Sequence, residues 1–260
     1  MEWNIIHLDE TDSTNRWLRN HGDGSLDRNH GDGSPDRSEA GDQENRPRDA
    51  VVVWTDYQTA GRGCGANTWE SERGKNLLFS LLIHPAEMQA SHQYSISMAI
   101  SNSIAHVLST YVRNVTIKWP NDIYVGDGKI CGILIENTLK GTAVKDSIIG
   151  VGLNVNQLRF ESDAPNPVSL ANLVGRLFDR EALLHEILSA FDAEWADLEG
   201  VRLRYLRRLY RRTDFHRYRD ACGEFYAKIV TVEDDGHLTL ETIDGYTRRY
   251  AFKEVQFVIS

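Results

Sequence analysis

The 260-residue sequence contains few cysteines and no apolar run that approaches the roughly 20 residues required by a membrane-spanning helix. Cys64, Cys131 and Cys222 are widely spaced and include no Cys-x-x-Cys pair, which a zinc site or a redox centre would use. A basic, apolar leader is also missing after Met1. We therefore expect reduced thiols in a soluble, cytoplasmic protein.

An excess of basic residues is missing too, because 38 acidic residues outnumber 29 basic ones and give a formal charge of -9. General nucleic-acid binding needs a positive surface that neutralises phosphates, so we do not expect it. The exception is residues 202–212, a run with six arginines and no acid. Leu203, Leu206 and Leu209 give this run one apolar face, which indicates an amphipathic helix, with a docking surface for an acidic partner domain as the alternative.

The spacing of apolar residues predicts a sheet core with packed helices, and therefore an α+β fold. Strands are expected at 3–8, 51–55, 76–84, 115–119, 129–136 and 148–155, and helices at 14–20, 89–112 and 180–199. Beyond about residue 218 the pattern changes to short strands separated by Asp-Gly turns, at 225–232, 237–242, 248–252 and 255–259, which indicates a separate small β-barrel.

We predict two domains, at residues 1–216 and 217–260. Within the first, residues 22–48 contain almost no apolar side chains, and an eight-residue segment is nearly duplicated there. Such a segment buries too little surface to offset the entropy of ordering it, so we expect a disordered insertion loop.

A glycine-rich loop follows the predicted strand at 51–55 and reads Gln58-Thr59-Ala60-Gly61-Arg62-Gly63-Cys64. Glycines let the backbone approach a phosphate closely, and the Arg62 guanidinium is a bidentate partner for an anion. The glycine spacing matches neither a Walker loop nor a dinucleotide fingerprint. A phosphate-binding loop and a plain surface turn both fit these residues.

Two lysines and a carboxylate flank a predicted hairpin. Pro120 is expected to end the first strand, and Gly126-Asp127-Gly128 to form the turn, so that Lys118, Asp122 and Lys129 converge. Ammonium groups offset charge that develops on a carboxylate and a phosphate, and the carboxylate can hold magnesium or a ribose. The set predicts an adenylation site, with a surface charge cluster as the alternative.

Glycines also interrupt the otherwise strong strand Ile148-Ile149-Gly150-Val151-Gly152-Leu153-Asn154. Glycine inside a strand marks the close approach of a ligand or of another backbone. Asn154 would then hydrogen-bond a planar polar ligand, whereas a bulge with a satisfied amide explains the stretch equally well.

In order and spacing these segments resemble the biotin protein ligase family over nearly the whole chain. The matching motifs are Asp12-Ser13-Thr14-Asn15, Gln58-Thr59-Ala60-Gly61-Arg62-Gly63, Lys118-Trp119-Pro120-Asn121-Asp122, Lys129 with Gly132, and Gly150-x-Gly152-x-Asn154. The resemblance implies a mixed-sheet catalytic domain related to class II aminoacyl-tRNA synthetases and lipoate ligases, followed by a small SH3-like β-barrel. Because the first motif begins at Asp12, we expect the short form that lacks the helix-turn-helix domain of repressor members.

The resemblance also implies roles for individual residues. Lys129, Arg62, Asp122 and Lys118 would be catalytic, with Lys129 as the electrostatic catalyst and Asp122 as the metal ligand. Lys129 and Arg62 would hold the biotin carboxylate and the α-phosphate. The biotin pocket would be lined by Ser13, Thr14, Asn15, Gln58, Gly132, Gly152 and Asn154. The loop and the nucleotide end would be formed by Gly61, Gly63, Cys64, Trp69 and Asn121.

The implied reaction uses ATP and Mg²⁺. The biotin carboxylate attacks the α-phosphorus, pyrophosphate leaves, and an acceptor lysine then attacks the mixed anhydride. The implied acceptor is the biotin carboxyl carrier protein of acetyl-CoA carboxylase or of another biotin-dependent enzyme. We expect no specific DNA binding and no membrane partner, and either a monomer or a homodimer. A lipoate or octanoate ligase or transferase is the nearest competing enzyme, and a non-catalytic regulator or nucleic-acid-binding module is the competitor from another class.

One position departs from the family pattern. The family loop commonly has a second arginine two residues after the first, where this chain has Cys64. With one fewer cation facing the phosphate, we expect biotinyl-AMP to be held less tightly. A reactive thiol at Cys64 is the alternative to a spectator residue.

Overall fold

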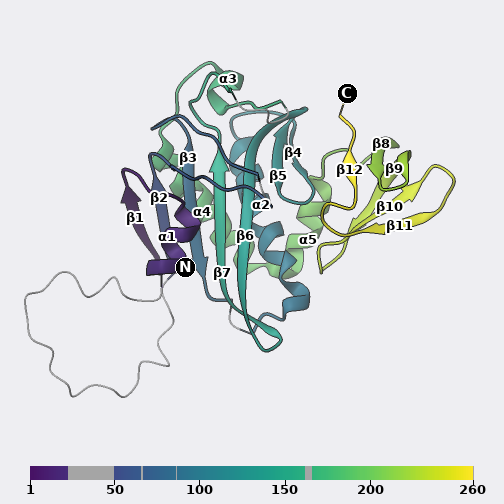
Figure 1. Ribbon diagram of the computed structural model, residues 1–260, viewed down its shortest axis with the longest axis horizontal. Helices are drawn as coiled ribbons and strands as arrows, with labels where there is room; N and C mark the ends of the chain where they lie inside the picture. The colour runs from purple at the N-terminus through teal and green to yellow at the C-terminus, as the bar shows by residue number, and fades with distance from the viewer. Residues whose placement is uncertain (23–49, 66, 86, 162–165, 260) are drawn as a thin grey trace, which may run out of the picture.

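A computed structural model describes residues 1–22, 50–65, 67–85, 87–161 and 166–259 of the chain. Seven strands in this part form one mixed sheet in the order β1-β2-β3-β7-β6-β5-β4 (Figure 1). They are β1 (Trp3–Leu8), β2 (Ala50–Thr55), β3 (Leu77–Ile83), β4 (Val115–Lys118), β5 (Asp122–Val125), β6 (Gly128–Lys140) and β7 (Ala143–Leu153). β1 and β2 run parallel, and the other neighbouring pairs are antiparallel. The predicted α+β fold is confirmed. Of the insertion loop predicted at residues 22–48, Gly22 alone is among the described residues.

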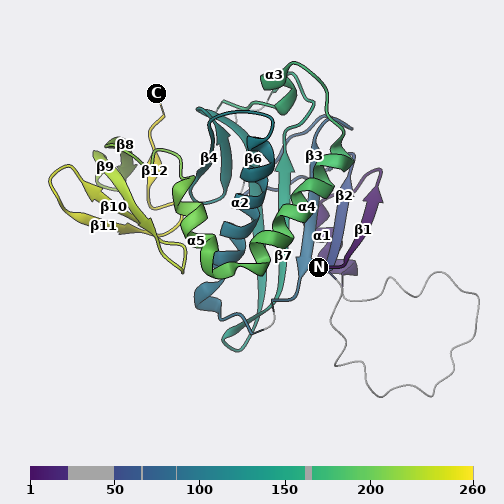
Figure 2. The ribbon, with the colours of Figure 1, turned by 180° about the vertical axis from the view of Figure 1, so that it is seen from behind.

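Helices cover both faces of this sheet. α2 (Tyr94–Ser109), α4 (Arg180–Ala196) and α5 (Leu198–Arg207) lie on one face, and α1 (Thr14–His21) lies on the other (Figures 1 and 2). The 3-10 helix η3 (Ala90–His92) and the short α3 (Leu170–Val174) lie in connections. Of the helices described, none is long and apolar enough to cross a membrane.

Strand alternation decides which layer each side chain reaches, because successive side chains point to opposite faces. Val52 of β2 joins the large core shared with α2 and α4, whereas Val53 packs with Leu18 of α1. Leu82 of β3 and Ile148 of β7 face α1 in the same way. β3 is buried along its whole length because both of its faces are covered.

Five strands near the C-terminus form a second, antiparallel sheet in the order β11-β10-β9-β8-β12 (Figure 1). They are β8 (His216–Asp220), β9 (Gly223–Val232), β10 (Leu238–Thr242), β11 (Thr247–Tyr250) and β12 (Gln256–Phe257). The predicted antiparallel strands are present and are consistent with a small SH3-like domain, but the barrel is not closed: among the described residues β11 and β12 are opposite edges that do not pair. β12 has only two residues, both paired with β8, which leaves it too short to close the sheet.

Hydrogen bonds join the second sheet to the preceding part of the chain. The indole of Trp119, next to β4, donates to the carbonyl of Gly236 at 2.9 Å, and the guanidinium of Arg202 in α5 donates to the carbonyl of Val232 in β9 at 3.1 Å. The second sheet therefore stands beside β4, β5 and α5 (Figure 1). The domain boundary at residues 216 and 217 stays a prediction.

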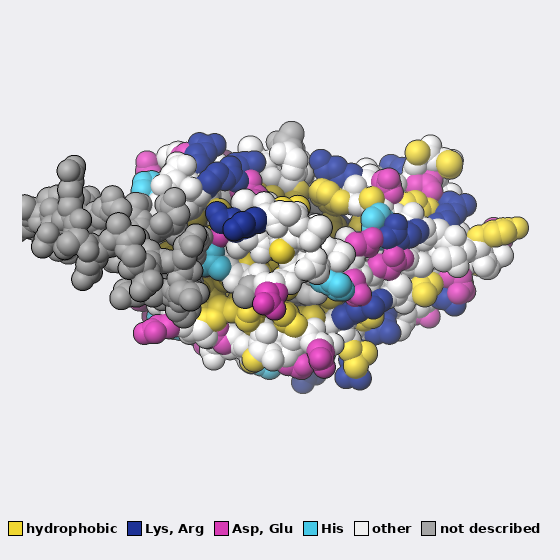
Figure 3. Space-filling view, turned by 90° about the horizontal axis from the view of Figure 1, so that it is seen from below, with side chains coloured by type: hydrophobic (Ala, Val, Ile, Leu, Met, Phe, Trp, Pro, Cys, Tyr) yellow, Lys and Arg dark blue, Asp and Glu magenta, His cyan; other side chains and the backbone are white. Residues whose placement is uncertain are grey.

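The arginine run at 202–212 is helical only in its first half. α5 ends at Arg207, and the buried Leu209 instead forms a parallel bridge with Ile117. Hydrogen bonds to neighbouring elements are donated by Arg202, Arg204, Arg208, Arg211 and Arg212. Figure 3 shows acidic and basic side chains intermingled on the face seen from below. These arginines therefore stabilise the fold rather than forming a free basic surface.

Candidate active site

A cavity of about 720 Å³ opens on the face of the first sheet that carries α1. It is bounded by the start of α1, the loop after β2, strands β4 to β7, and the connection between β11 and β12. The predicted site residues that line it are Ser13, Thr14, Asn15, Gln58, Arg62, Gly63, Cys64, Trp69, Lys118, Asn121, Asp122, Lys129, Gly132 and Gly152.

Two predicted site residues, Asn154 and Gly61, do not line the cavity. The Asn154 side chain is buried and donates to the carbonyl of Val168 at 3.2 Å, so the backbone satisfies its amide. The carbonyl of Gly61 accepts from the amide of Trp69 at 3.0 Å, which makes Gly61 part of the frame that holds the loop.

The cavity floor is a row of paired residues that crosses four strands. Lys118 lies opposite Asp122, Asp122 opposite Gly132, and Gly132 opposite Gly152. Paired residues point to the same face, so the register alone brings these positions together. The two glycines leave the centre of the floor without side chains, where a ligand can approach the backbone.

A network of polar side chains forms one end of the cavity. The hydroxyl of Ser80 lies 2.7 Å from that of Thr14 and 2.6 Å from Asn15 Oδ1, and the side-chain oxygen of Gln58 accepts from the amide of Thr14 at 2.9 Å. Ser13 occupies the N-cap position of α1, yet its side chain makes no capping hydrogen bond. These groups supply donors and acceptors for a planar polar ligand.

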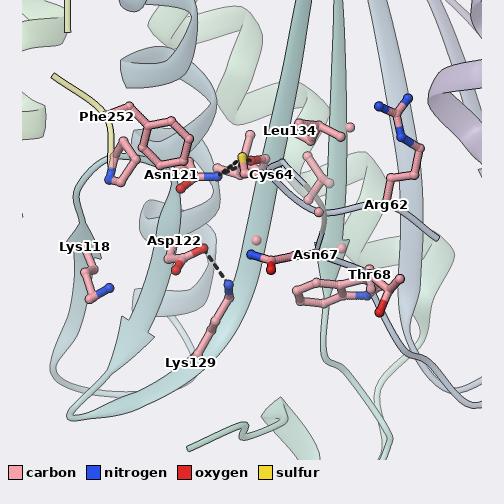
Figure 4. Close-up of a pocket in the computed structure, with 18 of the residues that line it drawn as sticks. Arg62, Cys64, Asn67, Thr68, Lys118, Asn121, Asp122, Lys129, Leu134 and Phe252 are labelled. Atoms are coloured by element: carbon pink, nitrogen blue, oxygen red, sulfur yellow. Dashed lines mark hydrogen bonds and ion pairs between the residues drawn. The ribbon is translucent and has the colours of Figure 1, made fainter. Parts of the chain in front are cut away.

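Charged side chains form the other end. Lys129 Nζ lies 2.7 Å from Asp122 Oδ1 (Figure 4). Lys118 Nζ stands over the rings of Tyr124 and Phe257, at 5.2 and 5.1 Å from their centroids. Burial lowers the pKa of Lys118, and the charge of Lys129 adds to that effect while Asp122 opposes it. An anion in the cavity would stabilise the Lys118 ammonium.

The glycine-rich loop folds back on itself as an irregular hairpin. The amide of Gly63 donates to the carbonyl of Asn67 at 2.8 Å, and Arg62 and Thr68 form an antiparallel bridge. The pairing carries Trp69 over the floor, where its ring occupies the space that a Cβ would need at Gly132 or Gly152. The buried indole N-H of Trp69 has no hydrogen-bond partner in the described part of the chain, so it remains a donor for a ligand.

The structure does not bring the Arg62 guanidinium together with Lys129. Arg62 is 39% exposed and forms an ion pair of 3.3 Å with Glu136, and it points away from the pair of Asp122 and Lys129 (Figure 4). Glu136 also accepts from Asn15 at 2.9 Å and pairs with Arg19 at 2.7 Å. Burial alone would raise the pKa of Glu136, but these hydrogen bonds and the two guanidinium charges hold it below its usual value.

The thiol of Cys64 lines the cavity and contacts the side chain of Asn121. The side-chain amide of Asn121 donates to its sulfur at 2.9 Å and to the carbonyl of Ile133 at 2.6 Å. Burial raises the pKa of Cys64, and the nearby charge of Asp122 raises it further. A reactive thiolate at this position is therefore disfavoured.

The sequence interpretation missed several residues that line the cavity or hydrogen-bond to those that do. Ser80 had a detectable signal, as a buried polar residue in the middle of the apolar strand β3. Glu136 ends the predicted strand at 129–136, but only the register shows that it faces Asn15. Phe252, Lys253 and Phe257 reach the cavity from the second sheet, and local sequence gave no signal for them.

The donor set fits a magnesium ion that arrives with ATP. Among the described residues, no group of three His, Cys, Asp or Glu side chains could hold a metal by itself. Asp122 supplies one carboxylate, and Mg²⁺ is commonly held by one or two carboxylates together with substrate phosphates.

Comparisons with known proteins agree with this arrangement. A sequence model of the Biotin/lipoate A/B protein ligase family matches residues 34–154. The bifunctional ligase/repressor BirA of Bacillus subtilis is 31% identical over 218 residues, covering 80% of this chain and 66% of that protein. This chain belongs to the biotin protein ligase family.

Further relatives support membership of the biotin protein ligase family, which confirms the prediction from the five motifs. The biotin-[acetyl-CoA-carboxylase] ligase of Paracoccus denitrificans is 28% identical over 195 residues, which cover 70% of this chain and 80% of that ligase. A structure of biotin protein ligase from Aquifex aeolicus in complex with biotin and ATP shares the fold, with a TM-score of 0.72, 21% identity and 99% of each chain covered. This chain spans slightly less than two thirds of the Bacillus relative.

Proposed function

We propose that this chain is an ATP-dependent biotin protein ligase, which forms biotinyl-AMP and pyrophosphate and then transfers biotin to a lysine of a carrier protein. The observation that carries the proposal is the layout of the cavity. The cavity has a polar end and a charged end, and between them Gly132 and Gly152 form the floor, with the indole of Trp69 above it. A neutral ring with an acidic tail, joined to a nucleotide, matches this order of groups.

In this proposal the ureido ring of biotin binds at the polar end. Thr14, Asn15 and Gln58 supply the hydrogen bonds, and Ser80 orients the first two. The tail crosses Gly132 and Gly152, so that the carboxylate points toward Lys129. The Trp69 ring lies over both glycines, so it must either shift aside when biotin binds or lie directly against the bound biotin tail.

The first step forms one bond and breaks another. A carboxylate oxygen of biotin attacks the α-phosphorus of ATP, and the bond to the β-phosphate oxygen breaks, releasing pyrophosphate. Lys129 stabilises the negative charge that gathers on the α-phosphate, and Asp122 holds the Lys129 ammonium in place at 2.7 Å. Lys118 adds a second positive charge at the same end.

The second step needs no covalent bond to the enzyme. The neutral amine of the acceptor lysine attacks the carbonyl carbon of biotinyl-AMP, AMP leaves, and the amine loses a proton. Positioning and charge stabilisation account for the expected acceleration. Magnesium, when bound with ATP beside Asp122, supplies charge neutralisation on the phosphates.

The expected partner is the biotin carboxyl carrier protein of acetyl-CoA carboxylase or of another biotin-dependent enzyme. The acetyl-CoA-carboxylase ligase of Paracoccus denitrificans supports this choice. A cytoplasmic location, the absence of specific DNA binding, and a monomeric or homodimeric state remain part of the proposal. The three free cysteines agree with a reducing compartment.

Pyrophosphate release from MgATP with biotin, lipoate and octanoate in parallel tests the proposal. We expect release with biotin and not with the other two acids. Release with lipoate or octanoate but not with biotin would identify the chain as one of the competing lipoate or octanoate ligases. No release with any of the three acids would contradict the proposal that the chain is an adenylating enzyme.

A further inference from the structure

The charges around the cavity do not balance. Among the described residues that line it, Arg62, Lys118, Lys129 and Lys253 are basic, and Asp122 alone is acidic. Arg62 pairs with Glu136, and Lys129 pairs with Asp122. Lys118 and Lys253 form no ion pair with any described residue. Two ammonium groups are therefore left to face an anionic ligand.

Lys253 reaches the cavity from the second sheet. It lies between β11 and β12, and its backbone has a φ of 72°, a left-handed conformation that residues other than glycine rarely adopt. Gly65, which follows Cys64 in the glycine-rich loop, has a φ of 73°. A Cβ built on Gly65 would collide with Lys253 Nζ and lie 3.4 Å from its Cε, so the ammonium rests directly on the glycine-rich loop.

The position of this ammonium matters because Cys64 and Gly65 carry no charge of their own. Burial and the charge of Asp122 raise the pKa of Cys64, whereas the positive charges of Lys129 and Lys253 oppose the rise. Lys253 thus acts electrostatically on the segment of the loop that faces the charged end of the cavity. Its Nζ lies 5.5 Å from the centroid of the Phe252 ring, which also lines the cavity.

We propose that Lys253 is a phosphate-binding residue, supplied by the C-terminal sheet to the phosphate chain of ATP in the first sheet's cavity. The inference rests on the proposed function, because it takes ATP as the nucleotide. Lys253, Lys118 and Lys129 line the same cavity, so that the phosphates lie among three ammonium groups. Phe257 of the same sheet contacts Lys118, and the second sheet is in this way a structural part of the nucleotide site.

Calorimetric titration of the full chain with ATP and with adenosine tests the assignment. The chain is first saturated with biotinol, in which an alcohol replaces the carboxylate, so that the biotin site is filled and no adenylate forms. Magnesium is present throughout. The variants are Lys253→Gln, Lys253→Arg and Lys253→Gly, since glycine removes the charge while adopting the left-handed backbone freely.

The matched control is Lys228→Gln. Lys228 belongs to the same sheet, is 40% exposed, and pairs with Glu241 at 2.7 Å, away from the cavity. We expect Lys253→Gln and Lys253→Gly to weaken ATP binding by about fivefold or more. Lys253→Arg and the control should bind ATP within about twofold of the unmodified chain, and adenosine binding should stay unchanged in every variant.

Two results would overturn the assignment. ATP binding that is unchanged in Lys253→Gln and Lys253→Gly would show that the ammonium does not contact the phosphates. Equal losses for ATP and adenosine would indicate a structural role. If the unmodified chain binds no ATP at all, the proposed function itself fails, which separates that case from the other two.

Discussion

Lys129 is the residue on which the proposed chemistry depends most. Its ammonium is held by Asp122 at 2.7 Å and lies beside the glycine floor, where a carboxylate and a phosphate would meet. Lys129→Ala removes the charge that stabilises the transition state, and we expect the rate of biotin-dependent pyrophosphate release to fall by about 10²- to 10³-fold.

The control for this prediction is Lys145→Ala. Lys145 is 45% exposed, is not among the cavity residues, and pairs with Asp146 at 3.2 Å. It should keep the rate of the unmodified chain. A Lys129→Ala enzyme that retained full activity would require another electrostatic catalyst.

Cys64 occupies the loop position at which the family commonly has a second arginine. Its sulfur contacts Asn121 inside the cavity, so a longer side chain at this position would extend toward the charged end. Cys64→Arg would add one cation to the phosphate site, and we expect biotinyl-AMP to dissociate about tenfold more slowly. Cys64→Ser should leave the dissociation rate unchanged, because it adds no charge. Equal rates for the unmodified chain and Cys64→Arg would contradict the idea.

At the scale of elements, the floor formed by β6 and β7 depends on glycines. A Cβ on Gly152 would lie 2.6 Å from Trp69 Nε1, so the indole would have to leave its place. We expect Gly152→Ala to raise the KM for biotin about tenfold or more, since a displaced ring and a new methyl group narrow the site.

Gly74→Ala separates this effect from general strain. Gly74 has a φ of 71°, and no atom of the described residues lies within 4 Å of the position that an alanine methyl group would take. Alanine there costs backbone strain of about 1 kcal/mol without touching the cavity. It should lower the melting temperature and leave the KM for biotin unchanged. An unchanged KM in Gly152→Ala would show that the ligand does not cross this floor.

Glu136 connects β6 to α1 and to the glycine-rich loop. Hydrogen bonds and the charges of Arg19 and Arg62 hold its folded-state pKa below the unfolded value, so its contribution to stability is complete above the unfolded pKa and is lost as pH falls through the folded pKa. Glu136→Gln should lower the free energy of unfolding by about 1 kcal/mol near neutral pH.

This difference should shrink in acid, because a protonated Glu136 no longer attracts the two guanidinium groups. Urea denaturation at about pH 7 and about pH 3.5, on either side of the ordinary glutamate pKa of roughly 4.3, measures it. Glu241→Gln, at an exposed ion pair with Lys228, should change stability little at either pH. A penalty for Glu136→Gln that stayed constant across this range would contradict the assigned contacts.

Local patterns predicted the elements better than their contacts. Runs of apolar residues placed β1, β2 and β3 to within one residue of their ends, whereas β7 begins at Ala143 rather than at the predicted residue 148. The Asp12-Ser13-Thr14-Asn15 motif indicated the start of α1 correctly. β8 and α3 were missed, since five residues give too short a pattern to detect.

Contacts between distant segments could not be predicted in the same way. The pairing of Arg62 with Glu136 depends on where a loop meets β6, and no local residue pattern encodes that meeting. Asn154 matched a motif, yet its buried amide is satisfied by Val168. Both differences arise from tertiary hydrogen bonds and ion pairs.

At the scale of the whole molecule, the two sheets share one cavity. The first sheet supplies the floor, the polar end and most of the charges, while the connection between β11 and β12 supplies Phe252 (Figure 4) and Lys253. The sequence predicted the second sheet as an independent barrel, because its strands and turns are local. Its open edge and its part in the cavity follow from packing against β4, β5 and α5, as the hydrogen bond from Trp119 to Gly236 illustrates.

The complete reaction tests the central claim most directly. The full chain is incubated with MgATP, biotin and an isolated biotin carboxyl carrier domain, and the intact mass of the carrier is measured. We predict the addition of one biotin to one carrier lysine, requiring ATP, lost with Lys129→Ala, and absent when lipoate replaces biotin. A carrier that stays unmodified by the folded chain, or one that gains lipoate instead of biotin, would contradict the account.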